Sequence, residues 1–107
     1  MSFIIVLITA PNKHEAANIV RTLLEEKLIA CANILDKVHS LFWWREKVED
    51  EEESLVLMKS KQTLFKKLSD RITELHSYDV PEILALPIVK GSQAYLDWIK
   101  ACLESER

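Results

Sequence analysis

Residues 38–58, VHSLFWWREKVEDEEESLVLM, contain the pattern that decides the fold. Successive side chains of a strand point to opposite faces, and residues 29–44 alternate in this way, with large apolar residues on both faces near Trp44. Residues 45–47 must turn the chain, although they include no Gly or Asn to ease a tight turn. Residues 48–58 then return, acidic at first and apolar later. The stretch predicts a long β-hairpin whose tip carries Phe42, Trp43 and Trp44.

The segment before the hairpin predicts a strand followed by a helix. Residues 3–8 form a continuous apolar run rich in β-branched residues, which is typical of a strand covered on both faces. Asn12 followed by Glu15 indicates a helix N-terminus with reciprocal capping. Apolar residues then recur at helical spacing over residues 16–24, with charges on the opposite face.

The segment after the hairpin predicts a helix, a strand and a last helix. Ser60 is expected to cap a helix with an apolar stripe over residues 64–75, and His76 is expected to end it. Residues 83–89 form a strand, and its two flanking and internal prolines favour a sheet edge. In the last helix one face carries Tyr95, Trp98, Ile99, Cys102 and Leu103.

The predicted order of elements is strand–helix–strand–strand–helix–strand–helix. We therefore expect an α+β fold, a ferredoxin-like split βαβ sandwich with a long hairpin and an extra C-terminal helix. The 107 residues suit a single domain spanning residues 1–107. Hairpin strands of about 14 residues extend roughly 45 Å, whereas a domain of this length is only about 26 Å across. The aromatic tip should overhang the body, and such a surface usually marks an interface, so we expect a homo-oligomer.

Composition and motifs exclude several classes of protein. The net charge of −3 argues against nucleic-acid binding, and the apolar start is too short to span a membrane. No signal peptide is evident, and two cysteines far apart favour reduced thiols and a cytoplasmic location. Residues 53–58 lack the aromatic residues with which RNA-binding sheets stack on bases. The loop at residues 9–13 lacks the Gly-rich anion-binding sequence of small phosphatases of this fold. It also lacks the CxxC motif of copper chaperones. No nucleophile–base pair or organic-cofactor motif is present, so we do not expect an enzyme.

Two places carry side chains capable of binding chemistry. Cys31 lies in an apolar strand start, where it is either a buried small hydrophobe or a metal ligand. His76, Tyr78 and Asp79 bring an imidazole, a phenol and a carboxylate together before Pro81. They either line a polar pocket or serve as helix capping and turn hydrogen bonds. The acidic run at residues 49–53 is best interpreted as a solvated strand, since alternate carboxylates point to opposite faces.

Taken together, several segments resemble one family, the CutA divalent-cation tolerance proteins. They occur in the family's order and spacing and cover nearly the whole chain. The segments are TAP at residues 9–11, EKLIACAN at 26–33, SLFWW at 40–44, MKS at 58–60, HSYDVPEI at 76–83 and YLDW at 95–98.

The resemblance implies a ferredoxin-like fold assembled as a tight homotrimer, with the long hairpins packing between subunits. It also implies a cytoplasmic role in tolerance of copper and other divalent cations, by binding the metal or a small ligand. The family's trimer is similar in shape to the PII signalling proteins. The alternative is therefore a structural or signalling trimer that binds a small molecule or a partner protein, with copper binding incidental.

The resemblance also implies site residues. Cys31 matches the family's usual cysteine, a candidate copper ligand. His76, Tyr78 and Asp79 match its His-Pro-Tyr-Glu turn at an intersubunit cleft, with Trp44 and Lys59 nearby and His76 a second candidate metal ligand. The sequence departs from the pattern in three places, which are Glu46 for Gly, Ser77 for Pro and Asp79 for Glu.

Overall fold

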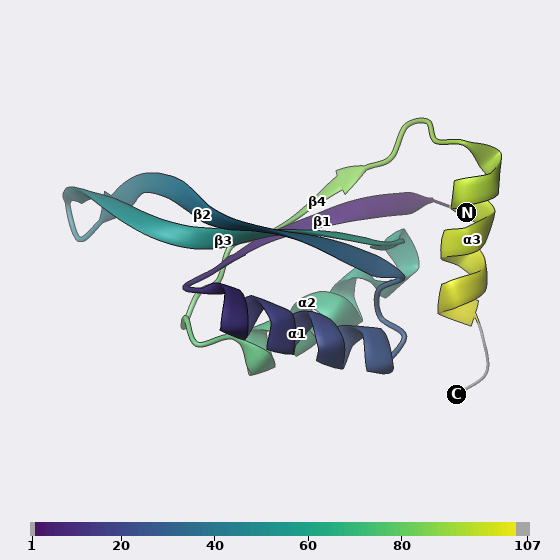
Figure 1. Ribbon diagram of the computed structural model, residues 1–107, viewed down its shortest axis with the longest axis horizontal. Coiled ribbons are helices and arrows are strands. Elements are labelled where there is room, and N and C mark those ends of the chain that lie inside the picture. The colour runs from purple at the N-terminus through teal and green to yellow at the C-terminus, as the bar shows by residue number, and fades with distance from the viewer. Residues whose placement is uncertain (1, 105–107) are drawn as a thin grey trace.

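The computed structural model describes residues 2–104 and has the predicted α+β architecture (Figure 1). The elements are β1 (Phe3–Ala10), α1 (Lys13–Glu25), β2 (Cys31–Trp44), β3 (Lys47–Lys61), a 3-10 turn (Gln62–Leu64), α2 (Phe65–Leu75), β4 (Ile83–Pro87) and α3 (Gln93–Glu104). They form one four-stranded sheet of order β2-β3-β1-β4, and every neighbouring pair is antiparallel. The ferredoxin-like fold, the long hairpin and the edge position of β4 are confirmed.

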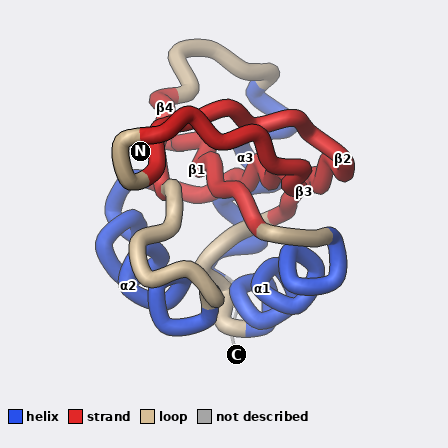
Figure 2. The backbone as a smooth tube through the Cα atoms, turned by 90° about the vertical axis from the view of Figure 1, so that its left-hand side faces the viewer, coloured by secondary structure: helices blue, strands red, loops and turns tan. Residues whose placement is uncertain are grey.

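The core lies between the sheet and the helices α1 and α2, which lie side by side on one face of the sheet (Figures 1 and 2). Alternate residues of β1, including Val6 and Ile8, point into it and are fully buried. Leu23 of α1 and Ile72 of α2 meet them from the other side. Each such side chain contributes roughly 1.5–3 kcal/mol when removed from water, so this layer carries most of the stability.

The opposite face of the sheet is left open within the subunit. The run at residues 3–8 was expected to be covered on both faces, but Ile5 and Leu7 are only half-buried. Among residues 2–104, α3 covers only one end of their face, at Phe3 and Cys31. Leu84 and Leu86 of β4, which pair with Leu7 and Ile5, are 55% and 49% exposed. The open face is therefore apolar. We call it the bare sheet face, and its members are Ile5, Leu7, Leu55, Leu57, Leu84 and Leu86.

Of the two predicted helix starts, one is confirmed in part and one is wrong. Asn12 caps α1, since its side-chain oxygen accepts a hydrogen bond from the Glu15 amide at 2.8 Å. The Glu15 carboxylate, which was expected to complete a reciprocal cap, accepts from Ser77. Ser60 does not cap α2, because β3 continues past it in register with β1, Ile4 opposite Ser60. The buried Ser60 hydroxyl instead donates to the carbonyl of Leu28 at 2.7 Å, which ties β3 to the segment after α1.

The β2–β3 hairpin projects beyond the body, as predicted (Figure 1). The molecule measures 44 × 28 × 22 Å, and Trp43 and Trp44 near the tip are 75% and 57% exposed. Arg45 and Glu46 make the turn with φ angles of 49° and 66°, a left-handed backbone that glycine or asparagine normally supplies. Among residues 2–104, no helix is long and apolar enough to cross a membrane.

Candidate functional site

A groove of about 1070 Å³ lies where the hairpin leaves the body. One wall is the hairpin and the other is the turn after α2 together with the end of β1. The lining residues are Thr9, Pro11, His39, Ser40, Leu41, Phe42, Trp44, Glu49, Glu51, Glu52, Glu53, Tyr78, Asp79, Val80 and Glu82. Of the predicted ligand residues, Trp44, Tyr78 and Asp79 therefore share one groove.

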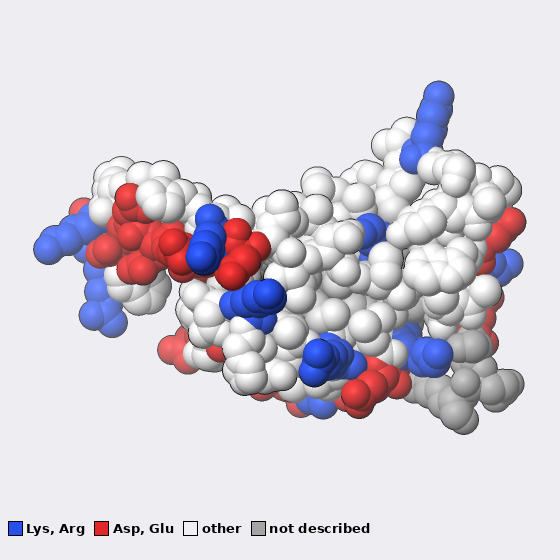
Figure 3. Space-filling model, viewed as in Figure 1, with Lys and Arg blue, Asp and Glu red and all other residues white. Residues whose placement is uncertain are grey.

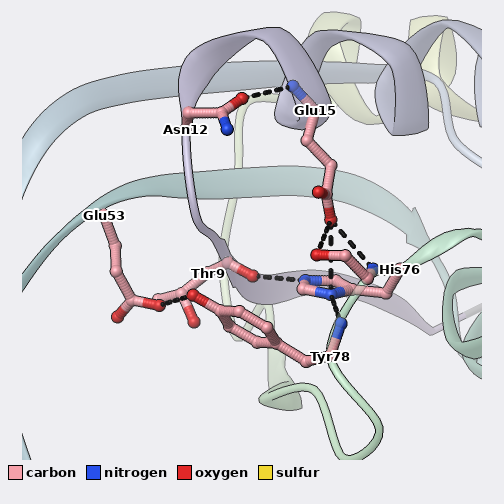
Figure 4. A network of polar contacts seen from close by, with 7 residues as sticks. Thr9, Asn12, Glu15, Glu53, His76 and Tyr78 are labelled. Atoms are coloured by element: carbon pink, nitrogen blue, oxygen red, sulfur yellow. Dashed lines mark hydrogen bonds and ion pairs between the residues drawn. The ribbon is translucent and has the colours of Figure 1, made fainter.

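His76 lies behind this groove with its side chain fully buried (Figure 4). Its Nε2 donates to the carbonyl of Thr9 at 2.7 Å, and its Nδ1 accepts from the Tyr78 amide at 3.0 Å. These two bonds assign the proton of the neutral ring to Nε2. Because both ring nitrogens are engaged, binding of a metal ion by His76 would have to break one of these bonds.

A carboxylate supports the same turn from α1. The Oε2 atom of Glu15 accepts from the amide and the hydroxyl of Ser77, at 3.0 and 2.8 Å, and lies 3.5 Å from Nδ1 of His76 (Figure 4). Both interpretations of the His76 segment thus describe part of the structure. The segment makes turn hydrogen bonds, and it also lines a polar groove.

Tyr78 links the turn to the hairpin. Its hydroxyl donates to Glu53 at 2.8 Å, and its ring packs against that of His76 with a centroid separation of 4.7 Å. Burial raises the pKa of the Tyr78 phenol well above its usual range, and the hydrogen bond to Glu53 and the negative charges of Glu53, Glu15 and Glu51 raise it further. Tyr78 is therefore a protonated hydrogen-bond donor at neutral pH.

The groove is strongly acidic. Among residues 2–104, six of its lining residues are carboxylates, Glu49, Glu51, Glu52, Glu53, Asp79 and Glu82, and no lysine or arginine lines it. Figure 3 shows Asp and Glu gathered along the hairpin, with Lys and Arg at its tip. Such a lining attracts cations and repels anions. The acidic run was expected to be a solvated strand, but its last member, Glu53, is only 7% exposed and takes part in the site.

The remaining candidates, Cys31 and Lys59, lie at the far end of the hairpin. They face each other across β2 and β3, whereas Trp44 faces Lys47 near the tip. The twelve residue-to-residue steps of β3 from Lys47 to Lys59 correspond to about 40 Å of strand. A single subunit therefore places Trp44, Tyr78 and Asp79 on the lining of one groove, with His76 behind it, and keeps Cys31 and Lys59 far from Trp44.

Cys31 is half-buried, so it is not the fully buried core residue that one of the two interpretations describes. Its Sγ lies 3.2 Å from the hydroxyl of Tyr95 in α3, a partner that sequence spacing does not reveal because the two residues are 64 positions apart. The Lys59 ammonium donates to Asn33. Within residues 2–104 of one subunit, no three His, Cys, Asp or Glu side chains are grouped as ligands for a metal ion.

The split βαβ sheet, the overhanging hairpin and the groove at its base define a ferredoxin-like α+β domain. The chain belongs to the CutA1 divalent ion tolerance protein family, which it matches over residues 4–102. The family resemblance of the sequence segments is thereby confirmed.

Relatives and solved structures agree with this assignment. The divalent-cation tolerance protein CutA of Thermus thermophilus is 44% identical over 96 residues, which cover 90% of this chain and 93% of the relative. The crystal structure of CutA1 from Oryza sativa superposes with a TM-score of 0.93 at 37% identity, covering 95% of this chain and 94% of that one. The periplasmic divalent cation tolerance protein CutA of Archaeoglobus fulgidus gives 0.93 at 39% identity, covering 95% and 99%.

Two plant relatives are longer than this chain. The chloroplastic CutA of Arabidopsis thaliana and the chloroplastic CutA 1 of Oryza sativa are each 39% identical to it over 97 residues. Those residues make up 53% and 55% of the two relatives, so the chain spans about half of their length.

Proposed function

We propose that this protein acts in divalent-cation tolerance as a non-enzymatic, cytoplasmic homotrimer that binds copper, another divalent cation or a small ligand. The bare sheet face carries the proposal. Six apolar side chains of β1, β3 and β4 lie together on it without a covering helix. Apolar patches of this kind on small domains mark interfaces, and a second copy is the partner that family membership favours.

The hairpin supports the same assembly. It extends past the body with Trp43 75% exposed, so its tip is left largely uncovered by residues 2–104 of the subunit. A neighbouring subunit supplies that cover. Assembly also brings residues of different subunits together, which is what the separated candidates Cys31 and His76 require if both are to bind one metal ion.

The acidity of the groove supports a cationic ligand. Trp44, Tyr78 and Asp79 line it, and the carboxylates of the hairpin give it a negative potential. Carboxylate oxygens are suitable ligands for hard divalent cations.

The alternative function is a PII-like signalling trimer with copper binding incidental. The groove has room for a small organic molecule, because its volume of about 1070 Å³ is near the upper end of the roughly 300–1,000 Å³ of such binding sites. The carboxylate lining argues that such a molecule carries positive charge.

Native mass spectrometry of the metal-free protein during a copper titration, with and without reductant, tests the proposal. A trimer that takes up a fixed number of ions per subunit supports it. A trimer that binds no copper at low micromolar concentration favours the alternative, and a monomer contradicts both. Fractionation of the source cells tests the cytoplasmic location, which the two reduced thiols support.

A further inference from the structure

The groove at the base of the hairpin contains a row of carboxylates along β3. Glu49, Glu51 and Glu53 are alternate residues of this strand, so their side chains leave it on the same face, and all three line the groove. Alternate residues of a strand are roughly 6.4–6.8 Å apart, so the row extends over about 13 Å. Asp79 and Glu82 line the opposite wall. The negative charge of the groove is therefore spread along the hairpin and does not lie at one point (Figure 3).

An aromatic surface of β2 runs beside this row. Phe42 is the direct partner of Glu49 in the β2–β3 register, and Ser40 is the partner of Glu51, so these side chains lie on one face of the hairpin. Trp44 follows two residues after Phe42 and also lines the groove. Phe42 and Trp44 are 39% and 57% exposed. The groove therefore presents carboxylates and apolar ring surface side by side along the same length of hairpin.

Two observations indicate that this surface suits an organic cation. The guanidinium carbon of Arg45 lies 5.4 Å from the ring centroid of Trp44, within the range of a cation–π contact, so the chain already places one cation on this ring. Within residues 2–104, the ion pairs of lysine and arginine are made with Asp70, Glu26 and Glu74, which do not line the groove. The groove carboxylates therefore repel one another without a compensating cation from these residues, and a cationic ligand relieves that repulsion.

We propose that the groove binds a linear organic polycation, an aliphatic chain whose ammonium groups are separated by methylene spacers. The ammonium groups donate charge-assisted hydrogen bonds to the row of carboxylates, and the spacers pack on Phe42 and Trp44. A metal ion carries its charge at one point, whereas an extended polycation matches the length of the row. The inference rests on the proposed function, in which the groove binds a small ligand, and it names the chemical class of that ligand.

Isothermal titration calorimetry of the metal-free protein with spermidine, a linear triamine, tests the site at fixed ionic strength. We expect one spermidine per subunit. The double variant Glu49→Gln/Glu51→Gln removes two charges of the row and keeps the side-chain shapes, so it should weaken binding by roughly 2–30-fold. Glu25→Gln/Glu104→Gln is the matched control, because it removes two exposed charges outside the groove, and it should bind spermidine like the wild type.

A titration with Mg²⁺ separates the shape of the ligand from its charge. Mg²⁺ should bind more weakly than spermidine at the same ionic strength. Tighter binding of Mg²⁺, absence of spermidine binding, or equal spermidine affinity in the double variant and its control would overturn the inference.

Native mass spectrometry of the same samples records the state of assembly. If the double variant changes that state, Glu51→Gln alone is compared with Glu25→Gln, and equal affinities again overturn the inference. Because no copper is present, a negative result leaves the proposed binding of divalent cations standing. A negative copper titration, in turn, does not alter the measured affinity for spermidine.

Discussion

Tyr78 and Tyr95 are the only tyrosines of the chain, and both phenols are held protonated by their surroundings. Because the folded-state pKa is raised, the unfolded chain releases the phenol proton at a lower pH than the folded chain does. The stability that these phenols contribute is therefore complete below about pH 10, the ordinary pKa of tyrosine, and is lost as the pH rises through the folded-state values.

We predict that the ultraviolet absorbance of tyrosinate will develop about two pH units later in the folded protein than in the unfolded one for Tyr95, whose folded pKa is about 12, and later still for Tyr78. Stability measured by urea unfolding should fall with pH above about 10. Tyr78→Phe and Tyr95→Phe assign the two steps. Titration of both phenols near pH 10 in the folded state would contradict the prediction.

Removal of the Tyr78 hydroxyl should destabilise the subunit. Tyr78→Phe leaves the buried carboxylate of Glu53 without its phenol donor, and an unsatisfied buried polar group costs about 1–3 kcal/mol. Urea unfolding at neutral pH measures the loss. Tyr95→Phe is the matched control, since Tyr95 is 43% exposed and its hydroxyl bonds to a sulfur atom, and a change within about 0.5 kcal/mol is expected. Equal losses of stability in the two variants would contradict the prediction, because the hydrogen bond to Glu53 would then contribute no more than the contact of Tyr95 with Cys31.

At the scale of secondary-structure elements, the chain turns at the hairpin tip and after α1 without a glycine. Arg45 and Glu46 at the hairpin tip have left-handed backbones, and so does Lys27, which follows α1 (φ 60°). At Lys27 the amide of Leu28 donates to the carbonyl of Leu23 and so closes the helix end. A side chain in this backbone region costs roughly 1–2 kcal/mol per residue, so these positions store strain.

Replacement of the tip by the preferred turn sequence should relieve that strain. The double variant Arg45→Asn/Glu46→Gly should raise the free energy of unfolding by about 1 kcal/mol, because Asn-Gly suits two successive left-handed residues. The midpoint of urea unfolding measures the gain. Lys47→Gly is the control, since a glycine in a strand costs about 0.5–1 kcal/mol relative to alanine. A loss of stability in the double variant would contradict the prediction.

The sequence predicted the elements better than their contacts. Hydrophobic periodicity and the Asn12 cap are local signals, so the fold and the start of α1 could be inferred. Ser60 has the appearance of a cap, but strand register, which depends on distant residues, extends β3 past it. For the same reason the partnerships of Glu53 with Tyr78 and of Cys31 with Tyr95 were not predictable, since they are set by how the elements pack.

At the scale of the whole molecule, the bare sheet face should decide the state of assembly. Leu86→Glu places a charge on this face where the wild-type side chain is 49% exposed, so the subunit should still fold while the proposed trimer dissociates. Analytical ultracentrifugation and circular dichroism measure the two properties. Lys67→Glu, on the exposed surface of α2, is the control and should leave the trimer intact. A Leu86→Glu trimer as stable as the wild type would locate the interface elsewhere.

The overhanging hairpin also bears on the life of a newly made chain. Before the proposed assembly forms, a folded subunit displays tryptophans at its tip and, within residues 2–104, unpaired sheet edges at β2 and β4. Such features promote aggregation and mark proteins for degradation by quality control. Assembly depends on the concentration of subunits, whereas degradation of one subunit does not. The cell's supply of this protein should therefore rise more steeply than its rate of synthesis, because scarce subunits are removed before they meet.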